Sequence, residues 1–515
     1  MKTIRLFSIM ALLLAGSAYS QNGDLDATFD SDGKVSTEFG NYNSSINSLA
    51  LQPDGKIIAA GATFNNGSYH RFALARYNTN GSIDTSFGTD GKVIGNHPTL
   101  KMSLCSILLQ SDGKIIGGGI IYNNFSDSQF FLMRLNADGS VDTNYGTNGM
   151  IVSSNININA MALQADGKIL AAGFIFNNSG NKDLALIRYN NDGTTDSGFG
   201  VNGLVTTSIG SRDIAKALAL QPDGKIVVAA TSTTSGYHSN FSLVRFFTNG
   251  EIDEAFGDDG VVSIDLDESD EPTSVKVQPD GRIVFTGWSG GSSSGSHAII
   301  RLMEDGDFDE SFGDEGIITG PGAEMAKSIE LQSDGKMIVA GAYQGGGSNN
   351  IALTRLEADG QPDTTFGENG LITTAFSTTC EANAVITQAD GKILIGGEAG
   401  TTGGTYSPDF ALARYFSGLE QLGINDHDIK KNSFSVYPNP VNQTVNLQAN
   451  LNNSDFISVD LLDLNGRKIQ NLMSKKDFGS GYNSHELTLP DTLASGTYIL
   501  NVSYGNNVSN IRIVK

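Results

Sequence analysis

Short stretches of alternating apolar and polar residues, each ending at a turn, recur along most of this chain. Residues 275–278 (Val-Lys-Val-Gln) and 329–332 (Ile-Glu-Leu-Gln) alternate with a period of two, which predicts strands with one buried face. The Pro-Asp-Gly or Ser-Asp-Gly that follows is a turn, in which glycine is free to take a positive φ. Unbroken apolar runs such as 57–61 and 226–230 come next and predict strands covered on both faces.

One turn motif, Gln-x-Asp-Gly-Lys or Gln-x-Asp-Gly-Arg, marks a repeating unit. A fixed period just above 50 residues is typical of a propeller or an array. Each period also holds a third strand such as 72–77 and a short fourth strand such as 92–94, so it has room for one four-stranded blade. The aspartates of the seven turns, spaced 54 to 58 residues apart, are Asp54, Asp112, Asp166, Asp223, Asp280, Asp334 and Asp390.

The two ends of the repeated region complement each other. Six of the seven third strands are followed by an Asp-x-x-aromatic-Gly run, but the last, which ends at Tyr415, has none. The missing piece stands near the beginning, at residues 25–29 and 32–35. A linear solenoid is expected to carry atypical capping units instead. We therefore predict an all-β, seven-bladed β-propeller over residues 21–416, closed by its N-terminal strand, which leaves only short, protected edges.

The repeated motifs also resemble a known family. The Gln-Pro-Asp-Gly-Lys turn at 52–56, the Ala-Leu-Ala-Arg-Tyr strand at 73–77 and the Asp-x-x-Phe-Gly-x-x-Gly run at 84–91 resemble the delta-60 repeat, a bacterial β-propeller-like repeat. The resemblance covers about residues 24–416. It implies a fold and says little about ligands.

The chain changes character after the last repeat. Residues 417–433 are polar and irregular and are interpreted as a linker, and the period disappears from Phe434 onward. Alternating segments such as 459–463, with Asn-Gly at 465–466 as a hairpin signal, predict several short strands. About eighty residues of this kind fit a small Ig-like β-sandwich over 434–515.

This segment resembles the type A C-terminal sorting domain of the type IX secretion system of Bacteroidetes. The resemblance implies passage across the outer membrane and removal of the domain by a sortase-like peptidase, often with attachment to surface lipopolysaccharide. An ordinary accessory binding sandwich is the alternative. The residues that carry the motif are Pro438, Asn439, Pro440, Gly466, Gly496 and Tyr498.

Residues 1–20 are typical of a secretory signal peptide, with Lys2 and Arg5 before an apolar stretch and cleavage expected between Ser20 and Gln21. A short membrane anchor is the alternative, but the apolar run is shorter than the roughly 20 residues that span a bilayer. No later segment approaches that length, so we expect no transmembrane segment. The protein is expected to be secreted or held on the outer cell surface, after passage through the periplasm.

Acidic residues outnumber basic ones by 56 to 33, which gives a net charge of −23. Nucleic acid is therefore excluded as an expected partner, because it is bound mainly through cationic side chains. The only two cysteines, at 105 and 380, are expected to be unpaired thiols.

Candidates for metal binding are weak, and we expect no cofactor. Turns such as Asn136-x-Asp138-Gly139-x-x-Asp142 have the look of calcium loops but lack the glutamate of an EF-hand, so plain turns are favoured. One acidic loop occurs in a single blade and is the better metal or partner candidate, although a solvated charge run is favoured. Its candidate ligands are Asp265, Asp267, Asp270 and Glu271.

No catalytic residue stands out. The arginine that ends each third strand, as at Arg76, is expected to pair with a carboxylate or a carbonyl inside or between blades. The loops at one end of every blade vary freely, and variable loops on a rigid scaffold are where ligands bind. Candidate ligand contacts there are Tyr69, Tyr122, Tyr237, Trp288, Tyr343 and Tyr406, with packing against their own loops as the alternative.

Taken together, the sequence favours a binding or structural module with a glycan or protein ligand, exported by the type IX machinery. One alternative is a secreted, polysaccharide-active hydrolase with carboxylates on the propeller face. A second is an adhesin or cell-surface assembly part with no small ligand.

Overall fold

The computed structural model divides the chain into two compact units, Met1–Gln421 and Leu422–Lys515, which are described separately. The predicted signal peptide, with Ser20 and Gln21, lies outside the described residues. The structure describes residues 22–515 except positions 41, 65–69, 96–100, 125–126, 154–155, 236–237, 267–268, 292–293, 321–324, 346–347, 377–378, 401–406, 420–432, 438–440, 442, 452–453, 464–466, 480, 491, 495 and 506.

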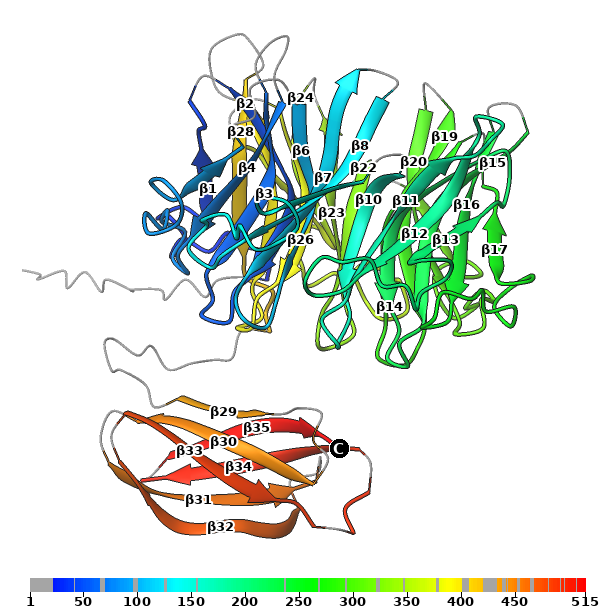
Figure 1. Ribbon diagram of the computed structural model, residues 1–515. Coiled ribbons are helices and arrows are strands. Elements are labelled where there is room, and N and C mark those ends of the chain that lie inside the picture. The colour runs from blue at the N-terminus through cyan, green and yellow to red at the C-terminus, as the bar shows by residue number, and fades with distance from the viewer. Residues whose placement is uncertain are drawn as a thin grey trace, which may run out of the picture. The chain divides into compact units, whose positions relative to one another are not determined.

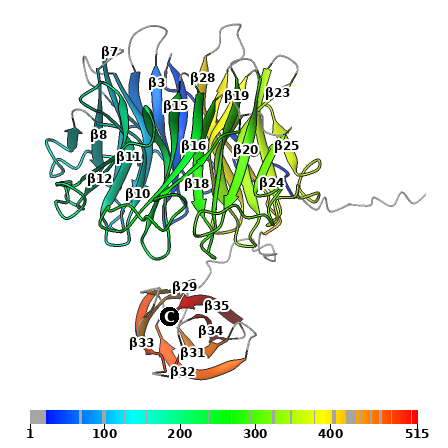
Figure 2. The ribbon, with the colours of Figure 1, turned by 90° about the vertical axis from the view of Figure 1, so that its right-hand side faces the viewer.

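The first unit contains seven four-stranded sheets, each an antiparallel blade (Figures 1 and 2). The prediction of seven four-stranded blades is therefore confirmed. Blades 1 to 3 comprise β2 (Asn43–Leu51), β3 (Ile57–Phe64), β4 (His70–Tyr77) and β5 (Lys92–Ile94); β6 (Lys101–Leu109), β7 (Ile115–Asn124), β8 (Asp127–Leu135) and β9 (Met150–Ser153); and β10 (Ile156–Leu163), β11 (Ile169–Phe176), β12 (Lys182–Tyr189) and β13 (Leu204–Thr207).

The remaining blades repeat this order. Blades 4 to 6 comprise β14 (Arg212–Leu220), β15 (Ile226–Ser235), β16 (His238–Phe246) and β17 (Val261–Ile264); β18 (Asp270–Val277), β19 (Ile283–Gly291), β20 (Ser294–Leu302) and β21 (Ile317–Gly320); and β22 (Met325–Leu331), β23 (Met337–Gly345), β24 (Ser348–Leu356) and β25 (Leu371–Thr374). Blade 7 comprises β26 (Cys380–Thr387), β27 (Ile393–Gly400), β28 (Pro408–Tyr415) and, from the start of the chain, β1 (Lys34–Thr37).

The pairing of β1 with β28 joins the two ends of the repeated region. Lys34 lies opposite Ala413 and Thr37 opposite Phe410, and Asp26 N donates to Arg414 O at 2.8 Å. Blades 7 and 1 also share one hydrophobic core, in which Leu394 and Leu412 of blade 7 pack with residues of blade 1. The first strand of each blade contacts the first strand of the next, and β26 contacts β2, so the seven first strands surround one axis.

The burial of the strands follows their sequence patterns. The apolar run Ile57–Phe64 is buried along nearly its whole length, because β3 lies inside its blade with neighbouring blades on both faces. The first strand, β2, alternates between buried and partly exposed positions over Asn43–Leu51, because one of its faces is turned toward the axis. These two patterns explain why each blade adds apolar surface to two shared cores.

A three-membered ionic cluster stabilises every blade at the end that carries the Gln-x-Asp-Gly-Lys turns, called here the uniform face. In blade 1, Asp84 Oδ2 lies 2.7 Å from Arg76 Nε and 2.9 Å from Lys56 Nζ. The Arg76 guanidinium lies 4.7 Å from the centre of the Phe87 ring and donates to Ala137 O of the next blade. The equivalent Arg–Asp pairs are Arg134–Asp142, Arg188–Asp196, Arg245–Asp253, Arg301–Asp309, Arg355–Asp363 and Arg414–Asp26.

The expectation that the repeated arginines pair with carboxylates and carbonyls is confirmed. Each arginine joins its own blade to the next, and in blade 7 Arg414 donates to Thr79 O of blade 1. In blade 6, Arg355 donates to Ser417 O, so the first residue assigned to the linker still takes part in the propeller's network.

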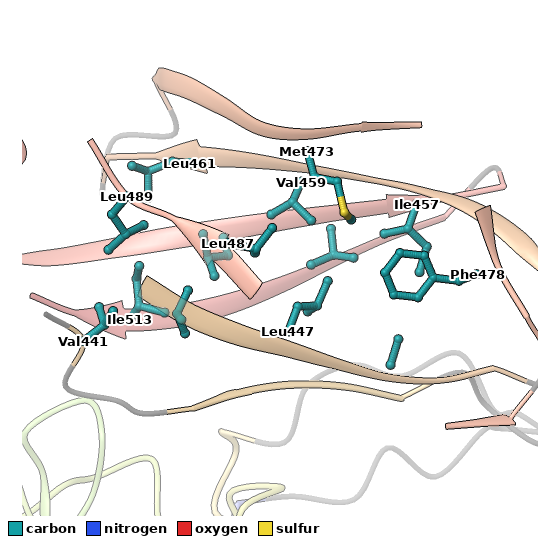
Figure 3. Close-up of a cluster of buried hydrophobic side chains, with 14 of the residues drawn as sticks. Val441, Leu447, Ile457, Val459, Leu461, Met473, Phe478, Leu487, Leu489 and Ile513 are labelled. Atoms are coloured by element: carbon teal, nitrogen blue, oxygen red, sulfur yellow. The ribbon is translucent and has the colours of Figure 1, made fainter. Parts of the chain in front are cut away.

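The second unit consists of two sheets that enclose a single core (Figure 3). A three-stranded sheet has the order β29-β30-β33, and a four-stranded sheet has the order β32-β31-β34-β35. The strands are β29 (Ser433–Tyr437), β30 (Thr444–Leu451), β31 (Asp455–Leu462), β32 (Lys468–Phe478), β33 (Gly481–Thr488), β34 (Thr497–Tyr504) and β35 (Asn507–Val514).

The core of the second unit shares no residue with the cores of the propeller. We therefore expect Ile457→Val, which removes one buried methylene group, to destabilise the second unit alone by about 1 kcal/mol. For a domain of this size that shift corresponds to roughly 4–8 °C in Tm. Calorimetry of the full chain should show a lower Tm for the transition of the second unit and an unchanged Tm for the propeller. A shift of both transitions would contradict the independence of the two cores.

Candidate functional site: the central channel

Each first strand is interrupted by a β-bulge, at which one extra residue breaks the pairing with the second strand. Bulges alter the direction of a side chain and leave the extra residue unpaired in the ladder. The carbonyl two residues before the bulge lies close to the second strand: a Cβ on Gly119 would lie 1.9 Å from Ser103 O, which favours glycine at this position in blade 2. Ala230 stands at this position in blade 4. The bulge residues are Asn47, Cys105, Asn159, Lys216, Thr273, Lys327 and Asn383.

In four blades the bulge side chain bonds to a backbone carbonyl of the following blade. These bonds act as ties between neighbouring first strands and satisfy a carbonyl next to the following bulge. The four bonds run from Asn47 Nδ2 to Leu104 O at 2.7 Å, from Asn159 Nδ2 to Ala215 O at 2.8 Å, from Thr273 Oγ1 to Ala326 O at 3.0 Å and from Asn383 Nδ2 to Ile46 O at 3.0 Å. Cys105, Lys216 and Lys327 depart from this pattern.

The bulges surround a cavity of about 500 Å³ on the propeller axis, to which all seven first strands contribute lining residues. Its charged lining residues are Lys216, Lys276 and Lys327, and none of the residues that line it is a carboxylate. The sign of these charges is opposite to the net charge of the chain, which is −23. The charged side chains that line the cavity are therefore positive, although the protein as a whole is acidic.

Each of the three lysines faces a glutamate of the following blade. Two of them form ion pairs, Lys216–Glu271 at 2.5 Å and Lys276–Glu330 at 2.6 Å. The charge of Lys327 acts on Glu381 of blade 7. Within the described part of the chain, Lys327 Nζ has no carboxylate oxygen within 4.0 Å and no hydrogen bond, so it is the one cavity lysine without a direct partner.

Two carboxylates lie side by side at the edge of this region, because Glu381 and Glu398 are directly opposite each other on β26 and β27. Like charges in this arrangement destabilise a sheet. Burial raises the pKa of the Glu381 carboxyl, the charge of Lys327 lowers it, and the charge of Glu398 raises it further, so the net shift is upward. Blade 7 is thus the only blade with glutamates at both of these positions.

Blade 5 has its own unusual row of side chains. Glu271, Trp288 and His297 lie opposite one another on three neighbouring strands. Burial lowers the pKa of His297. The other six blades have an apolar residue in place of this histidine, namely Phe72, Phe130, Leu184, Phe241, Ile351 and Phe410.

The structure describes three of the six aromatic residues predicted to contact a ligand. Tyr122 is 38% exposed and its ring centre lies 5.9 Å from that of His70, whereas Trp288 and Tyr343 are half-buried. They belong to blades 2, 5 and 6, and no ring contact joins any two of them among the described residues. Tyr69, Tyr237 and Tyr406 lie outside the described residues, so these contacts stay predictions.

Two of the acidic-loop candidates, Asp270 and Glu271, are held apart. Asp270 is buried and its Oδ2 accepts a hydrogen bond from Leu266 N at 2.9 Å, whereas the next residue, Glu271, faces the channel lysine Lys216. Consecutive strand residues point to opposite faces, which separates the two carboxylates. Asp267 lies outside the described residues. Among the residues that the structure describes, no three His, Cys, Asp or Glu side chains come together as a metal site.

The turns that resemble calcium loops use their carboxylates internally. Asp138 Oδ1 accepts hydrogen bonds from Ser140 N and Oγ, and Asp142 pairs with Arg134 and Lys114. The two cysteines are free thiols. Burial raises the pKa of the Cys105 thiol to about 11, so this channel residue is a thiol rather than a thiolate at neutral pH.

Two of the sorting-motif residues are described. Gly496 exchanges backbone hydrogen bonds with Lys515, and Tyr498 Oη donates to Ala494 O at 3.0 Å. The two backbone bonds hold Lys515, directly after the last strand, against Gly496. Pro438, Asn439, Pro440 and Gly466 lie outside the described residues.

Sequence reasoning missed Lys216, Lys327, Glu381 and Glu398. A signal for the first two was present, because every bulge residue stands seven positions before the aspartate of its Gln-x-Asp-Gly turn. Alignment of the seven repeats on that aspartate shows Asn, Cys, Asn, Lys, Thr, Lys and Asn in order. The glutamate pair has no such signal, because its two members meet only through the pairing of β26 with β27.

These features define a class: a seven-bladed β-propeller with a polar axial channel, followed by a separate β-sandwich. Comparison with family models identifies both parts. The sandwich, residues 435–515, matches the secretion system C-terminal sorting domain. The propeller matches a family described as "domain of unknown function (DUF5122) beta-propeller" at residues 52–87, 110–145, 164–199, 221–256, 278–312, 332–366 and 388–418.

The chain belongs to this family of repeat propellers and carries a type IX sorting domain at its C-terminal end. It is therefore exported, to the cell surface or into the medium, and engages the type IX secretion machinery. The described residues include no helix with the length and apolar character needed to cross a bilayer.

Solved structures with similar folds are distant. A protein of unknown function from Dyadobacter fermentans has 11% identity and a TM-score of 0.41, over 74% of this chain and 98% of its own. An ulvan lyase, a polysaccharide lyase, has 12% identity and a TM-score of 0.45, over 74% and 96%. Semaphorin 2a of Drosophila has 7% identity and a TM-score of 0.44, over 95% and 97%. No curated protein sequence matches the chain.

Proposed function

We propose that the propeller is a binding module of the exported protein and that its ligand enters the axial channel. The observation that carries this proposal is the presence of lysine at the bulges of blades 4 and 6, at Lys216 and Lys327. The ties between first strands are made by Asn or Thr at Asn47, Asn159, Thr273 and Asn383, so the fold does not require lysine at positions 216 and 327. Charged side chains that a fold does not need are candidates for recognition.

The position of Trp288 also supports a ligand site in the channel. It lies opposite Glu271, and Glu271 stands on the first strand two residues before the bulge of blade 5. Each first strand ends at the uniform face, so residues before the bulge lie toward the opposite end of the channel, where the variable loops are. A half-buried indole opposite Glu271, the ion-pair partner of the cavity lysine Lys216, offers a flat surface for a sugar ring or another flat ligand.

The test is a binding screen of the full exported chain against immobilised glycans and candidate surface proteins, combined with an assay for polysaccharide turnover. We expect saturable binding without turnover. Trp288→Ala should weaken binding by about tenfold, the loss typical of a buried aromatic contact. Phe247→Ala, which removes an exposed ring elsewhere on the propeller, is the matched control and should bind normally. Equal affinity of all three chains would remove Trp288 and its surroundings from the binding site.

A hydrolase is the second candidate, favoured by the adjacent carboxyls of Glu381 and Glu398. A carboxyl with a raised pKa beside an ionised one is the pairing that supplies an acid and a base at neutral pH. Turnover of a polysaccharide that disappears in Glu381→Gln, while the variant keeps its thermal stability, would replace the binding proposal with this one.

A further inference from the structure

The charged side chains that line the axial cavity are opposite in sign to the net charge of the protein. Acidic residues outnumber basic ones by 56 to 33 in the chain, yet the charged side chains that line the cavity are three lysines. They come from consecutive blades, 4, 5 and 6, so they occupy one side of the wall. Such a wall attracts an anion by direct contact at short range.

The ammonium groups of the cavity remain accessible to a ligand, although two of them form ion pairs. The Lys216 and Glu271 side chains are 25% and 51% exposed, and those of Lys276 and Glu330 are 39% and 21% exposed. Ion pairs as exposed as these are weak, so a ligand can exchange with the glutamates. Lys327 has no partner to lose among the described residues.

Hydroxyl groups in the wall supply further donors. Ser48 Oγ accepts a hydrogen bond from Ile107 N, and Ser328 Oγ accepts one from Val385 N. A hydroxyl that already accepts from the backbone retains its own hydrogen for donation. Because of the bulge, Lys327 and Ser328 both line the cavity, so an anion at Lys327 has a hydroxyl donor close by. Lysines and hydroxyls together are the donor set that proteins use for carboxylate, sulfate and phosphate groups.

We infer that the channel binds the anionic group of its ligand, a carboxylate, sulfate or phosphate, with Lys327 as the main contact and Lys216 and Lys276 beside it. This assignment rests on the proposed binding function and names the chemical class of the ligand. The glutamates of blades 5 to 7 and the net charge of −23 repel a dense polyanion, so the ligand carries isolated anionic groups.

Crystals of the full exported chain soaked in selenate give a direct test, because selenium has an anomalous signal. We expect one selenium peak in the channel about 4 Å from Lys327 Nζ, because the selenium lies one Se–O bond beyond the oxygen that accepts the charge-assisted hydrogen bond. In solution, calorimetric titration should show that glucuronate and glucose 6-phosphate bind and that glucose does not. Glucuronate tests a carboxylate source and glucose 6-phosphate a phosphate source.

Three variants decide the role of Lys327. Lys327→Gln should weaken anion binding by about tenfold or more, which is the value of one charged hydrogen bond. Lys327→Arg keeps the charge and should retain most of the affinity. Lys34→Gln makes the same charge change on the outermost strand of blade 7, outside the cavity lining, and should bind like the unaltered chain.

The outcomes separate the two proposals. Glucose binding as tightly as glucuronate, with no effect of Lys327→Gln, overturns the anion assignment and leaves a binding module for neutral ligands. A chain that binds no glycan, protein or anion in either experiment overturns the binding function as well. A selenate peak elsewhere on the surface, with none in the channel, also overturns the anion assignment.

Discussion

Removal of residues 22–37 should unfold the propeller or lower its stability by more than about 5 kcal/mol. The deletion takes away β1 and leaves β28 as an open edge with Phe410 and Leu412 beside it. It also removes Asp26, the carboxylate shared by Arg414 and Lys392, and an unpaired buried charge alone costs about 3–5 kcal/mol. Phe29, fully buried against Arg414, is lost as well.

The measurement is equilibrium unfolding in urea, with the chain purified in each form. A synthetic peptide of residues 22–40 should restore the original midpoint when added to the truncated chain, because it supplies the missing strand. Asp32→Ala is the matched control, since Asp32 is exposed and lies 3.8 Å from Lys34. A truncated chain with an unchanged midpoint would show that the N-terminal strand is not needed for a stable ring.

Acid should unfold the propeller steeply below about pH 4. Burial acts to raise the pKa of Asp363, but hydrogen bonds from Lys336 and Thr365 and the charge of Arg355 outweigh it and hold the pKa well below its usual range. The pKa of the equivalent carboxyl is also lowered in the other six blades, at Asp26, Asp84, Asp142, Asp196, Asp253 and Asp309.

The direction in which the free energy of unfolding changes with pH follows from proton linkage. These aspartates have a lower pKa in the folded than in the unfolded chain, where it is near 3.9. Their contribution is therefore complete above that value and is lost as the pH falls toward the folded pKa. Each group adds a slope of up to about 1.4 kcal/mol per pH unit, and the seven act in the same direction. Glu381 and Asp409, whose pKa is raised, contribute in the opposite direction.

Urea unfolding between pH 3 and pH 7 measures this slope. Asp84→Asn should be less stable at pH 7 and should have a shallower slope, because one of the seven groups no longer titrates. Asp90→Asn, at an exposed turn, is the control with the same chemical change. Stability that stays constant down to pH 3 would contradict the role of the ionic clusters.

The repeated part of the fold was predictable because its determinants are local. Every unit repeats the turn motif at 52–56, the apolar run at 57–61 and the Arg–Asp cluster. Because the same residues recur, the same backbone and contacts are expected in each unit. The missing Asp-x-x-aromatic-Gly run after Tyr415 and its presence at 25–29 predicted the pairing that the structure has between β1 and β28.

The channel was not predictable from the same patterns. Lysines at 216 and 327 look like ordinary polar positions of an alternating strand, and only the bulge turns them toward the axis. The bulge depends on pairing with the second strand, a property of two segments at once. Glu381 and Glu398 likewise become neighbours only through strand register. The loops that carry Tyr69, Tyr237 and Tyr406 lie outside the described residues, and their role stays a prediction.

The contact between Asp26 and Arg414 joins residues 388 positions apart, among the first and the last of the propeller. Synthesis begins at the end that holds the closing strand, but its partner emerges only after the other six blades. A nascent chain therefore has no closed ring to form until blade 7 is complete. The order of the strands therefore delays closure of the ring until blade 7 has been synthesised.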